Sequence, residues 1–240
     1  MKNLSFTIVM LLIFSSAMFA QVGINSDNSA PNSSAGLDVN FDNKGFLPPR
    51  MSTAQINAIA TPAEGLMVYN LSIHCPVYYN GTGWKRTDGQ FYIGASYGGG
   101  IIFYIDGTGQ HGLISATSDQ STGAEWGCLS TSIPGTSSAI GMGQANTTAI
   151  VTNCSTLGTA AQICDALVLN GYSDWFLPSK DELNQMYLQK TVIGGFGGNP
   201  YWSSYEYDAN LAWCQYFEEY GAQDYYWKDT TYYVRAVRAF

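Results

Sequence analysis

Alternation of apolar and polar residues is clearest near the end of the chain, where it predicts β-strands. In "WCQYF", a strand places Trp213, Gln215 and Phe217 on one side and the intervening residues on the other. The same alternation runs through "YVRAVRAF", which closes at Phe240. We expect this last strand to be buried by pairing with an early strand, such as residues 101–105. Trp213, Phe217 and the last strand are then the scaffold of this region.

A β-hairpin is expected upstream, in "GGGIIFYIDGTGQHGLISAT", because two apolar runs flank a Gly-rich turn. The segment over residues 118–153 is rich in Gly, Ser and Thr, and we expect it to be loop.

Two helices are predicted after this loop. The first places four apolar residues on one face and ends at Gly171. These four residues are Ala160, Ile163, Leu167 and Val168. The second helix follows Pro178, where Ser179 and Glu182 form an S-x-x-E capping box.

Residues 21–90 show weaker periodicity and are expected to form a leader and oligomerisation segment. A short helix over 52–60, capped by Ser52, precedes two strands in "GLMVYN" and "PVYYNGTGWKR". This segment has too few apolar residues for a core of its own. It needs other chains, or the domain that follows it, to bury its apolar face.

Residues 1–20 have the pattern of a secretory signal peptide. Lys2 precedes the apolar run "FTIVMLLIF", and small residues lead to a cleavage site after Ala20. The alternative is a membrane anchor, but this run is short for a span, and no later stretch approaches eighteen apolar residues. We therefore expect an exported chain that lies at the cell surface or outside the cell.

The charge balance disfavours a nucleic-acid partner. Without Lys2, nine basic residues face eighteen acidic ones, and binding to nucleic acid depends on basic side chains that neutralise phosphates. Charged residues make up 12% of the chain and aromatic residues 14%. Its surface polarity must come from Ser, Thr, Asn, Gln and Tyr, which are typical of adaptable binding surfaces.

Export favours disulfides among the five cysteines, and an odd number leaves at least one thiol unpaired within the chain. Cys128 and Cys154 both lie in expected loops and are the first choice, with Cys154–Cys164 as the alternative. No C-x-x-C motif occurs and the two histidines stand apart, so no metal site is expected.

No catalytic constellation stands out, and we expect neither an enzyme nor a cofactor. Asp181 and Glu182 are explained by the capping box. No serine, cysteine or histidine has the companions that nucleophilic catalysis requires. An exported hydrolase is the alternative, together with a structural surface or fibre component that binds no external ligand.

The segment "EEYGAQDYYWKDTTYY" has no clean period, and it contains five tyrosines and a tryptophan. So many hydroxyls are difficult to bury with partners, so we expect a solvent-facing recognition surface rather than an aromatic core. Acidic residues among the aromatics favour a polar or cationic partner, such as a protein or a glycan on another cell. The expected ligand-binding residues are Tyr205, Tyr216, Tyr220, Asp224, Tyr225, Tyr226 and Trp227.

Several blocks together resemble the Lcl-type C-terminal domain family, which occurs in exported bacterial adhesins. They are "GGGIIFYIDGTGQHGLISA", "WGC", "GYSDWFLPSKDEL", "YWSSYEYD" and "YYVRAVRAF", and they cover residues 91–240. The resemblance implies an α+β, C-type-lectin-like domain in which two helices pack against small antiparallel sheets. The best-known member binds sulfated polysaccharide through a basic surface, from which this acidic chain departs.

Two further resemblances concern assembly and variability. The leader is similar to segments that precede the tips of trimeric fibre-like proteins, which implies a trimer. Some members of the family are diversified by retroelements that rewrite codons of the final strands. Their fixed skeleton resembles Trp213, Gln215, Phe217 and Gly221, which places Cys214 among the variable positions as an unpaired thiol.

Overall fold

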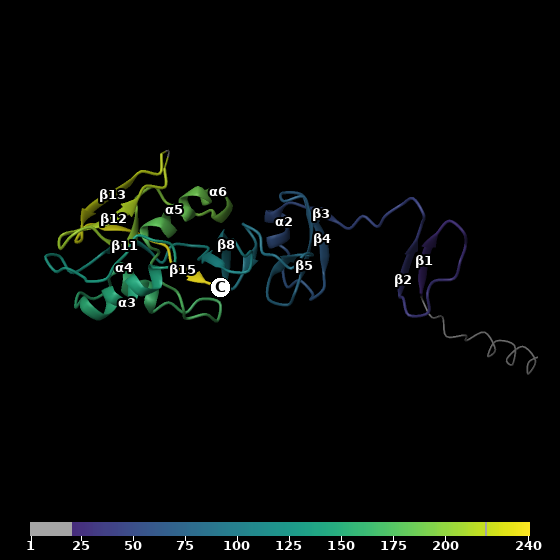
Figure 1. The fold of residues 1–240 in the computed structure, drawn as a ribbon, viewed down its shortest axis with the longest axis horizontal. Helices are drawn as coiled ribbons and strands as arrows, with labels where there is room; N and C mark the ends of the chain where they lie inside the picture. The colour runs from purple at the N-terminus through teal and green to yellow at the C-terminus, as the bar shows by residue number, and fades with distance from the viewer. Residues whose placement is uncertain (1–20, 219) are drawn as a thin grey trace, which may run out of the picture. The chain divides into compact units, whose positions relative to one another are not determined.

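The structure is a computed structural model that describes residues 21–218 and 220–240 (Figure 1). The expected signal peptide lies outside the described residues. The chain divides into two compact units, one that ends at Pro48 and one that runs over Pro49–Phe240.

The first unit contains a two-stranded parallel sheet. Strand β1 (Val22–Asn25) pairs with β2 (Leu37–Asn40), with Val22 opposite Leu37. Val22 and Leu37 are 51% and 52% exposed. Parallel sheets usually have both faces covered, and a two-stranded sheet is marginal by itself in water. Among the described residues, this ladder therefore lacks the cover that such sheets normally have.

The second unit begins with a four-stranded sheet in the order β3-β4-β5-β6. Its elements are β3 (Arg50–Met51), α2 (Thr53–Asn57), β4 (Met67–Asn70), β5 (Cys75–Tyr79) and β6 (Trp84–Arg86). The Ser52 cap is confirmed, although the helix is shorter than predicted. Ile56 and Trp84 are buried in the same cluster as Phe91, so residues 49–90 share a core with the residues that follow them.

A second four-stranded sheet has the order β15-β9-β8-β7. It consists of β7 (Ser96–Tyr97), β8 (Gly100–Ile105), β9 (Gly112–Ser115) and β15 (Val237–Ala239). The predicted hairpin is confirmed as β8 and β9. The last strand pairs with an early strand, as predicted, but its partner is β9 rather than residues 101–105, because β7 and β9 already occupy both edges of β8.

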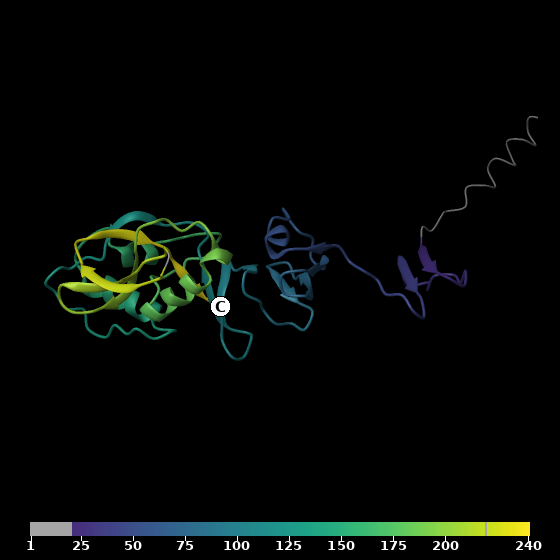
Figure 2. The same cartoon turned by 90° about the horizontal axis from the view of Figure 1, so that it is seen from above.

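The third sheet has five strands in the order β10-β14-β11-β12-β13, and β13 is an edge strand. Its elements are β10 (Ser121–Glu125), β11 (Tyr201–Glu206), β12 (Leu211–Gln215), β13 (Gln223–Trp227) and β14 (Thr231–Val234). Figure 2 shows the C-terminal strands of this sheet in yellow and yellow-green, whereas β10, from earlier in the chain, is teal.

The helices differ from the sequence prediction in two ways. The expected loop over 118–153 contains β10 and also helix α3 (Gly143–Asn153). This helix has no apolar stripe because polar residues form part of its buried face. Asn146 and Thr147 are fully buried there, and Thr147 Oγ1 donates to the Gly143 carbonyl at 2.8 Å.

Helix α4 (Ala160–Asp165) ends earlier than predicted, and its expected apolar face is confirmed only in part: Ile163 and Leu167 pack against the core. Ala160, Ala161 and Cys164 are buried, whereas Val168 lies beyond the helix and is 72% exposed. The small side chains allow close packing, which the apolar periodicity did not indicate. Helix α5 (Lys180–Leu188) has the predicted capping box between Ser179 and Glu182, and α6 (Lys190–Ile193) follows it.

Two buried arginines explain the "VRAVRAF" ending. Arg235 is 1% exposed, and its Nε donates to Asp119 at 2.7 Å. Arg238 donates to both carboxylate oxygens of Asp174, each at 2.8 Å, and its guanidinium lies 3.9 Å from the Tyr172 ring centroid. Buried charges need such partners. The last strand therefore joins distant loops to the core, as expected of a scaffold element.

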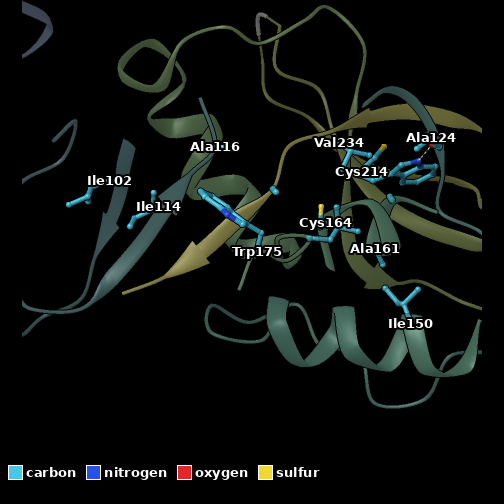
Figure 3. Close-up of a cluster of buried hydrophobic side chains, with 14 of the residues drawn as sticks. Ile102, Ile114, Ala116, Ala124, Ile150, Ala161, Cys164, Trp175, Cys214 and Val234 are labelled. Atoms are coloured by element: carbon cyan, nitrogen blue, oxygen red, sulfur yellow. Dashed lines mark hydrogen bonds between the residues drawn. The ribbon is translucent and has the colours of Figure 1, made fainter. Parts of the chain in front are cut away.

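The cysteines form one disulfide and include two buried free thiols. A disulfide joins Cys128 to Cys154, which was the first of the two expected pairings. Cys164 and Cys214 are free and buried, and Figure 3 shows both among core side chains that include Ala161 and Val234. Burial raises the pKa of the Cys214 thiol to about 12. Cys214 is thus part of the core, which does not suit a variable surface position.

Candidate functional site

The expected binding residues of β13 lie on two opposite faces of the sheet. Strand β12 pairs with β13 so that Tyr225 lies opposite Trp213, and Tyr226 lies opposite Ala212. Successive side chains of a strand point to opposite sides. We call the side with Tyr225 and Trp227 the Tyr225 face, and the side with Asp224 and Tyr226 the Tyr226 face. The prediction of one continuous binding face is therefore wrong.

The Tyr225 face bears a cluster of four aromatic residues, Tyr207, Trp213, Tyr225 and Trp227, which we call the aromatic strip. Tyr207 and Tyr225 stack with ring centroids 4.1 Å apart and planes 7° apart. Trp213 meets both rings edge-on, at 5.8 Å from Tyr207 and 5.4 Å from Tyr225. Tyr207, Tyr225 and Trp227 are 50%, 40% and 56% exposed. This is a large aromatic surface open to solvent.

Two members of the aromatic strip were missed or misassigned from the sequence. Tyr207 lies in the hairpin between β11 and β12, where no periodic pattern indicated it. Trp213 was expected in the scaffold, but it is half-buried and contacts Tyr207, Tyr225 and Lys180. The Lys180 ammonium lies 3.6 Å from the Trp213 ring centroid. The start of α5 thereby lies against this face of the sheet.

Two carboxylates lie near the aromatic strip, Asp208 in the β11–β12 hairpin and Asp224 at the free edge of β13. Asp208 Oδ1 accepts hydrogen bonds from the backbone N–H groups of Asn210 and Leu211, at 2.7 and 2.9 Å. Asp224 Oδ1 accepts one from the Tyr225 N–H at 2.9 Å. The neighbouring Tyr207 raises the pKa of the Tyr225 phenol most, and the Asp224 and Asp208 charges raise it further. Both carboxylates are thus within electrostatic reach of the exposed rings.

The Tyr226 face is a packed tyrosine cluster. The hydroxyls of Tyr216 and Tyr226 are 2.8 Å apart, and the hydrogen bond between them is the main cause of the raised pKa of Tyr216. Tyr226 also packs edge-on against Tyr232, with ring centroids 5.4 Å apart, and Tyr232 packs on the buried Trp202. Tyr226 is half-buried, and its contacts support the sheet. It does not belong to the exposed surface that the sequence predicted.

An open hollow of about 750 Å³ lies at the turn between β12 and β13. It is lined by Lys190, Tyr216, Glu218, Tyr220, Gly221 and Ala222. The Lys190 ammonium donates to the carbonyls of Phe217 and Glu218, at 2.8 and 2.9 Å, and so fixes the start of the turn. Tyr220 is 88% exposed. Tyr205 is half-buried on β11, separated from the edge strand by β12.

The far end of β13 is fixed by a buried lysine. Lys228 is fully buried, and its ammonium donates to the Thr131 carbonyl at 2.9 Å and pairs with the Glu206 carboxylate. It also lies 4.6 Å from the Trp126 ring centroid. Because Lys228 is the next residue in the chain, these contacts also fix the position of Trp227 in the aromatic strip.

The capping interpretation of Glu182 is confirmed. Its carboxylate is buried and accepts backbone hydrogen bonds from Gly141, Gly143 and Ser179, the shortest at 2.8 Å. Burial raises the pKa of this carboxyl group, although the hydrogen bonds act in the opposite direction. All three of these donors are backbone N–H groups, so this residue has a structural role.

Within residues 21–218 and 220–240, no group of three or more His, Cys, Asp or Glu side chains is placed to hold a metal ion. No helix over these same residues is both long enough and apolar enough to cross a membrane.

The fold and the site define an α+β protein with an exposed aromatic surface on an edge strand. The chain belongs to the Lcl C-terminal domain family, which matches residues 115–238. Residues 23–107 match the phage tail like trimerisation region, and this match supports assembly as a homo-oligomer. No curated protein matches the chain. The resemblance to the Lcl family seen in the sequence is thus confirmed.

Proposed function

We propose that the chain is an exported adhesion protein that binds a ligand on another cell or surface through the aromatic strip. The observation that supports this proposal is the exposure of Tyr207, Tyr225 and Trp227 beside one another. Large aromatic side chains bring wide contact area and few rotatable bonds, which suits recognition. If these rings had only a structural role, we would expect them to be buried.

The second part of the proposal is that assembly as a trimer strengthens binding. Three copies joined through the first part of the chain present three aromatic strips to one surface. Linked binding sites act with high effective concentration, so weak single contacts can still hold a cell. The ligand class is a protein or a glycan, because the acidic chain is a poor match for nucleic acid or sulfated polymers.

Two finer proposals concern the fold and its variability. We propose that the domain has a C-type-lectin-like architecture, in which the last strand closes the fold beside an early hairpin. We also propose that exposed positions near β13 are diversified by a retroelement, with core positions such as Cys214 held fixed. A reverse transcriptase gene and a near-copy of the final codons beside this gene would support it. Their absence from the neighbouring genome would remove the second proposal.

The proposed function is tested with an array of glycans and extracellular proteins. We expect residues 21–240, purified and fluorescently labelled, to bind at least one class of probe. The variant Tyr225→Ser/Trp227→Ser is expected to lose that binding while its oligomeric state stays unchanged. Assembly without binding to any probe would favour the alternative, a structural fibre component. Turnover in a broad substrate screen, abolished by one point substitution, would favour an exported hydrolase.

A further inference from the structure

The aromatic strip already holds one cation of its own chain. The Lys180 ammonium lies 3.6 Å from the Trp213 ring centroid, closer than the distance of about 6 Å within which such contacts are attractive. The negative ring face of Trp213 therefore already binds a cation within the folded chain. The neighbouring Tyr207 and Tyr225 rings, which stack on each other, offer the same kind of surface.

The stacked tyrosines leave ring surface available to a ligand. Stacking covers one face of Tyr207 and one face of Tyr225, and Trp213 contacts both rings edge-on. Half of the Tyr207 side chain and 40% of Tyr225 remain exposed. Trp227 lies two residues along the same strand and is 56% exposed. The aromatic strip can thus receive more than one flat group from an extended partner.

Two negative charges lie near Tyr225: Asp208 in the β11–β12 hairpin, and Asp224 beside Tyr225 on β13. Asp208 and Asp224 each use Oδ1 to accept backbone hydrogen bonds, which leaves the charge of the carboxylate in place. Both charges raise the pKa of the Tyr225 phenol, although Tyr207 raises it more. The chain as a whole has a formal net charge of −8. A cationic ligand complements this surface, and an anionic one does not.

The open edge of β13 is partly closed to main-chain pairing. Tyr216 N–H donates to the Ala222 carbonyl, and Lys228 N–H donates to the Asn210 carbonyl. With the observed register, even-numbered residues of β13 bond to β12, and the Tyr225 N–H faces the free edge. Asp224 occupies that N–H at 2.9 Å. An added strand would lose this donor, so recognition through side chains is favoured over strand addition.

We propose that the aromatic strip binds arginine side chains on an extended basic segment of a partner protein. A guanidinium group is planar and weakly hydrated, stacks on aromatic rings, and forms paired hydrogen bonds with carboxylates. Tyr207, Tyr225 and Trp227 provide the rings. Asp208 provides a carboxylate in the adjoining hairpin, and Asp224 provides one at the free edge of β13, where its Oδ1 lies 2.9 Å from the Tyr225 backbone nitrogen. This inference rests on the proposed function and specifies its ligand class as protein rather than glycan.

The probe is a fluorescein-labelled Gly/Ser peptide with three arginines at alternate positions. Its control is the same peptide with citrulline, which keeps the planar group and removes the charge. By fluorescence anisotropy, residues 21–240 should bind the arginine peptide at least about tenfold more tightly than the citrulline peptide. Binding should weaken as salt is raised, because the charges are exposed.

Variants of the two carboxylates locate the binding site. Asp208→Asn and Asp224→Asn keep the side-chain acceptor oxygens and remove the charges, and each should weaken arginine-peptide binding several-fold. The matched control is Asp106→Asn in the hairpin between β8 and β9, within a different sheet (Figure 1). Asp106 Oδ1 also accepts a backbone hydrogen bond in its turn, from Thr108 at 3.0 Å. This control should leave binding unchanged.

The Lys180→Gln variant should change the affinity for the arginine peptide in the opposite direction from the aspartate variants. It removes the resident cation from Trp213, while the Lys180 backbone carbonyl that accepts from Gln223 is retained. Arginine-peptide binding should therefore become tighter. Tyr226→Phe, on the Tyr226 face, should have no effect.

Three results would overturn the inference: equal binding of the two peptides, no weakening in either aspartate variant, or equal weakening in Asp106→Asn. If the array ligand is lost in Tyr225→Ser/Trp227→Ser while the arginine peptide never binds, the proposed function stands and this inference fails. If Tyr225→Ser/Trp227→Ser still binds the array ligand and the arginine peptide does not bind the wild type, both the proposed function and this inference fail.

Discussion

At the scale of single residues, adjacent aromatic side chains of β13 have different roles. Tyr225 is on the open Tyr225 face, whereas Tyr226 bonds to Tyr216 and packs on Tyr232. We expect Tyr225→Ser to change Tm by under about 2 °C, as is usual for exposed positions, and Tyr226→Ser to lower it by about 4–8 °C. Thermal denaturation of both variants measures this. The reverse order would show that the faces are misassigned.

A second residue-scale prediction concerns pH. The hydrogen bonds from Arg238 lower the pKa of Asp174 below its usual value, so its ionised form is favoured in the folded state. The stability from this pair is present above the unperturbed pKa of about 3.9 and is lost as pH falls through the lower, folded value.

Melting curves from pH 6 down to pH 2.5 test this. Wild type should lose more stability over the acid limb than Asp174→Asn, which cannot titrate. Parallel curves for the two proteins would contradict the assigned role of the Arg238 pair.

At the scale of elements, the turn between β12 and β13 depends on Gly221. Its φ of +59° lies in the left-handed region, and a Cβ there would lie 2.2 Å from the Tyr187 ring. We expect Gly221→Ala to cost about 1–3 kcal/mol in the free energy of unfolding. Gly107→Ala, where an added Cβ meets nothing within 4 Å, is the control and should cost far less. Urea denaturation measures both.

The disulfide is the other element-scale determinant. It joins the segment after β10 to the end of α3 across 26 residues of sequence. Cys128→Ser/Cys154→Ser should lower the free energy of unfolding by about 2–4 kcal/mol. If the double variant unfolds at the same urea concentration as wild type, the disulfide does not stabilise this region.

Local sequence signals predicted some elements well. The capping box of Ser179 and Glu182, the Ser52 cap and the hairpin of β8 and β9 all depend on contacts between near neighbours, which the sequence displays. Helix α3 could not be predicted in this way, because its buried Asn146 and Thr147 find partners far along the chain, at Ser204 and Leu177.

The candidate site was predicted only in part, for the same reason. The aromatic content near β13 was visible, but the face of each side chain depends on the register with β12, and "QDYYW" shows no alternation that fixes it. Tyr207 joins the aromatic strip only through a tertiary contact.

At the scale of the whole molecule, assembly follows from the first part of the chain. The exposed apolar residues of β1 and β2 and the match to a trimerisation region point to partner copies of this chain. We expect sedimentation equilibrium of residues 21–240 to give about three times the monomer mass. Ile24→Asp, which places a charge on an exposed apolar position of β1, should shift the equilibrium toward monomer. A monomeric wild type would contradict the proposed avidity.

The central claim is that the Tyr225 face is the surface that meets the ligand. Hydroxyl-radical footprinting tests it directly, by comparing side-chain oxidation in the free chain and in the chain bound to its array ligand. The account predicts protection of Tyr207, Tyr225 and Trp227 on binding, with Tyr232 unchanged. Protection confined to Tyr220 and the hollow at the β12–β13 turn, with the aromatic strip still fully oxidised, would contradict it.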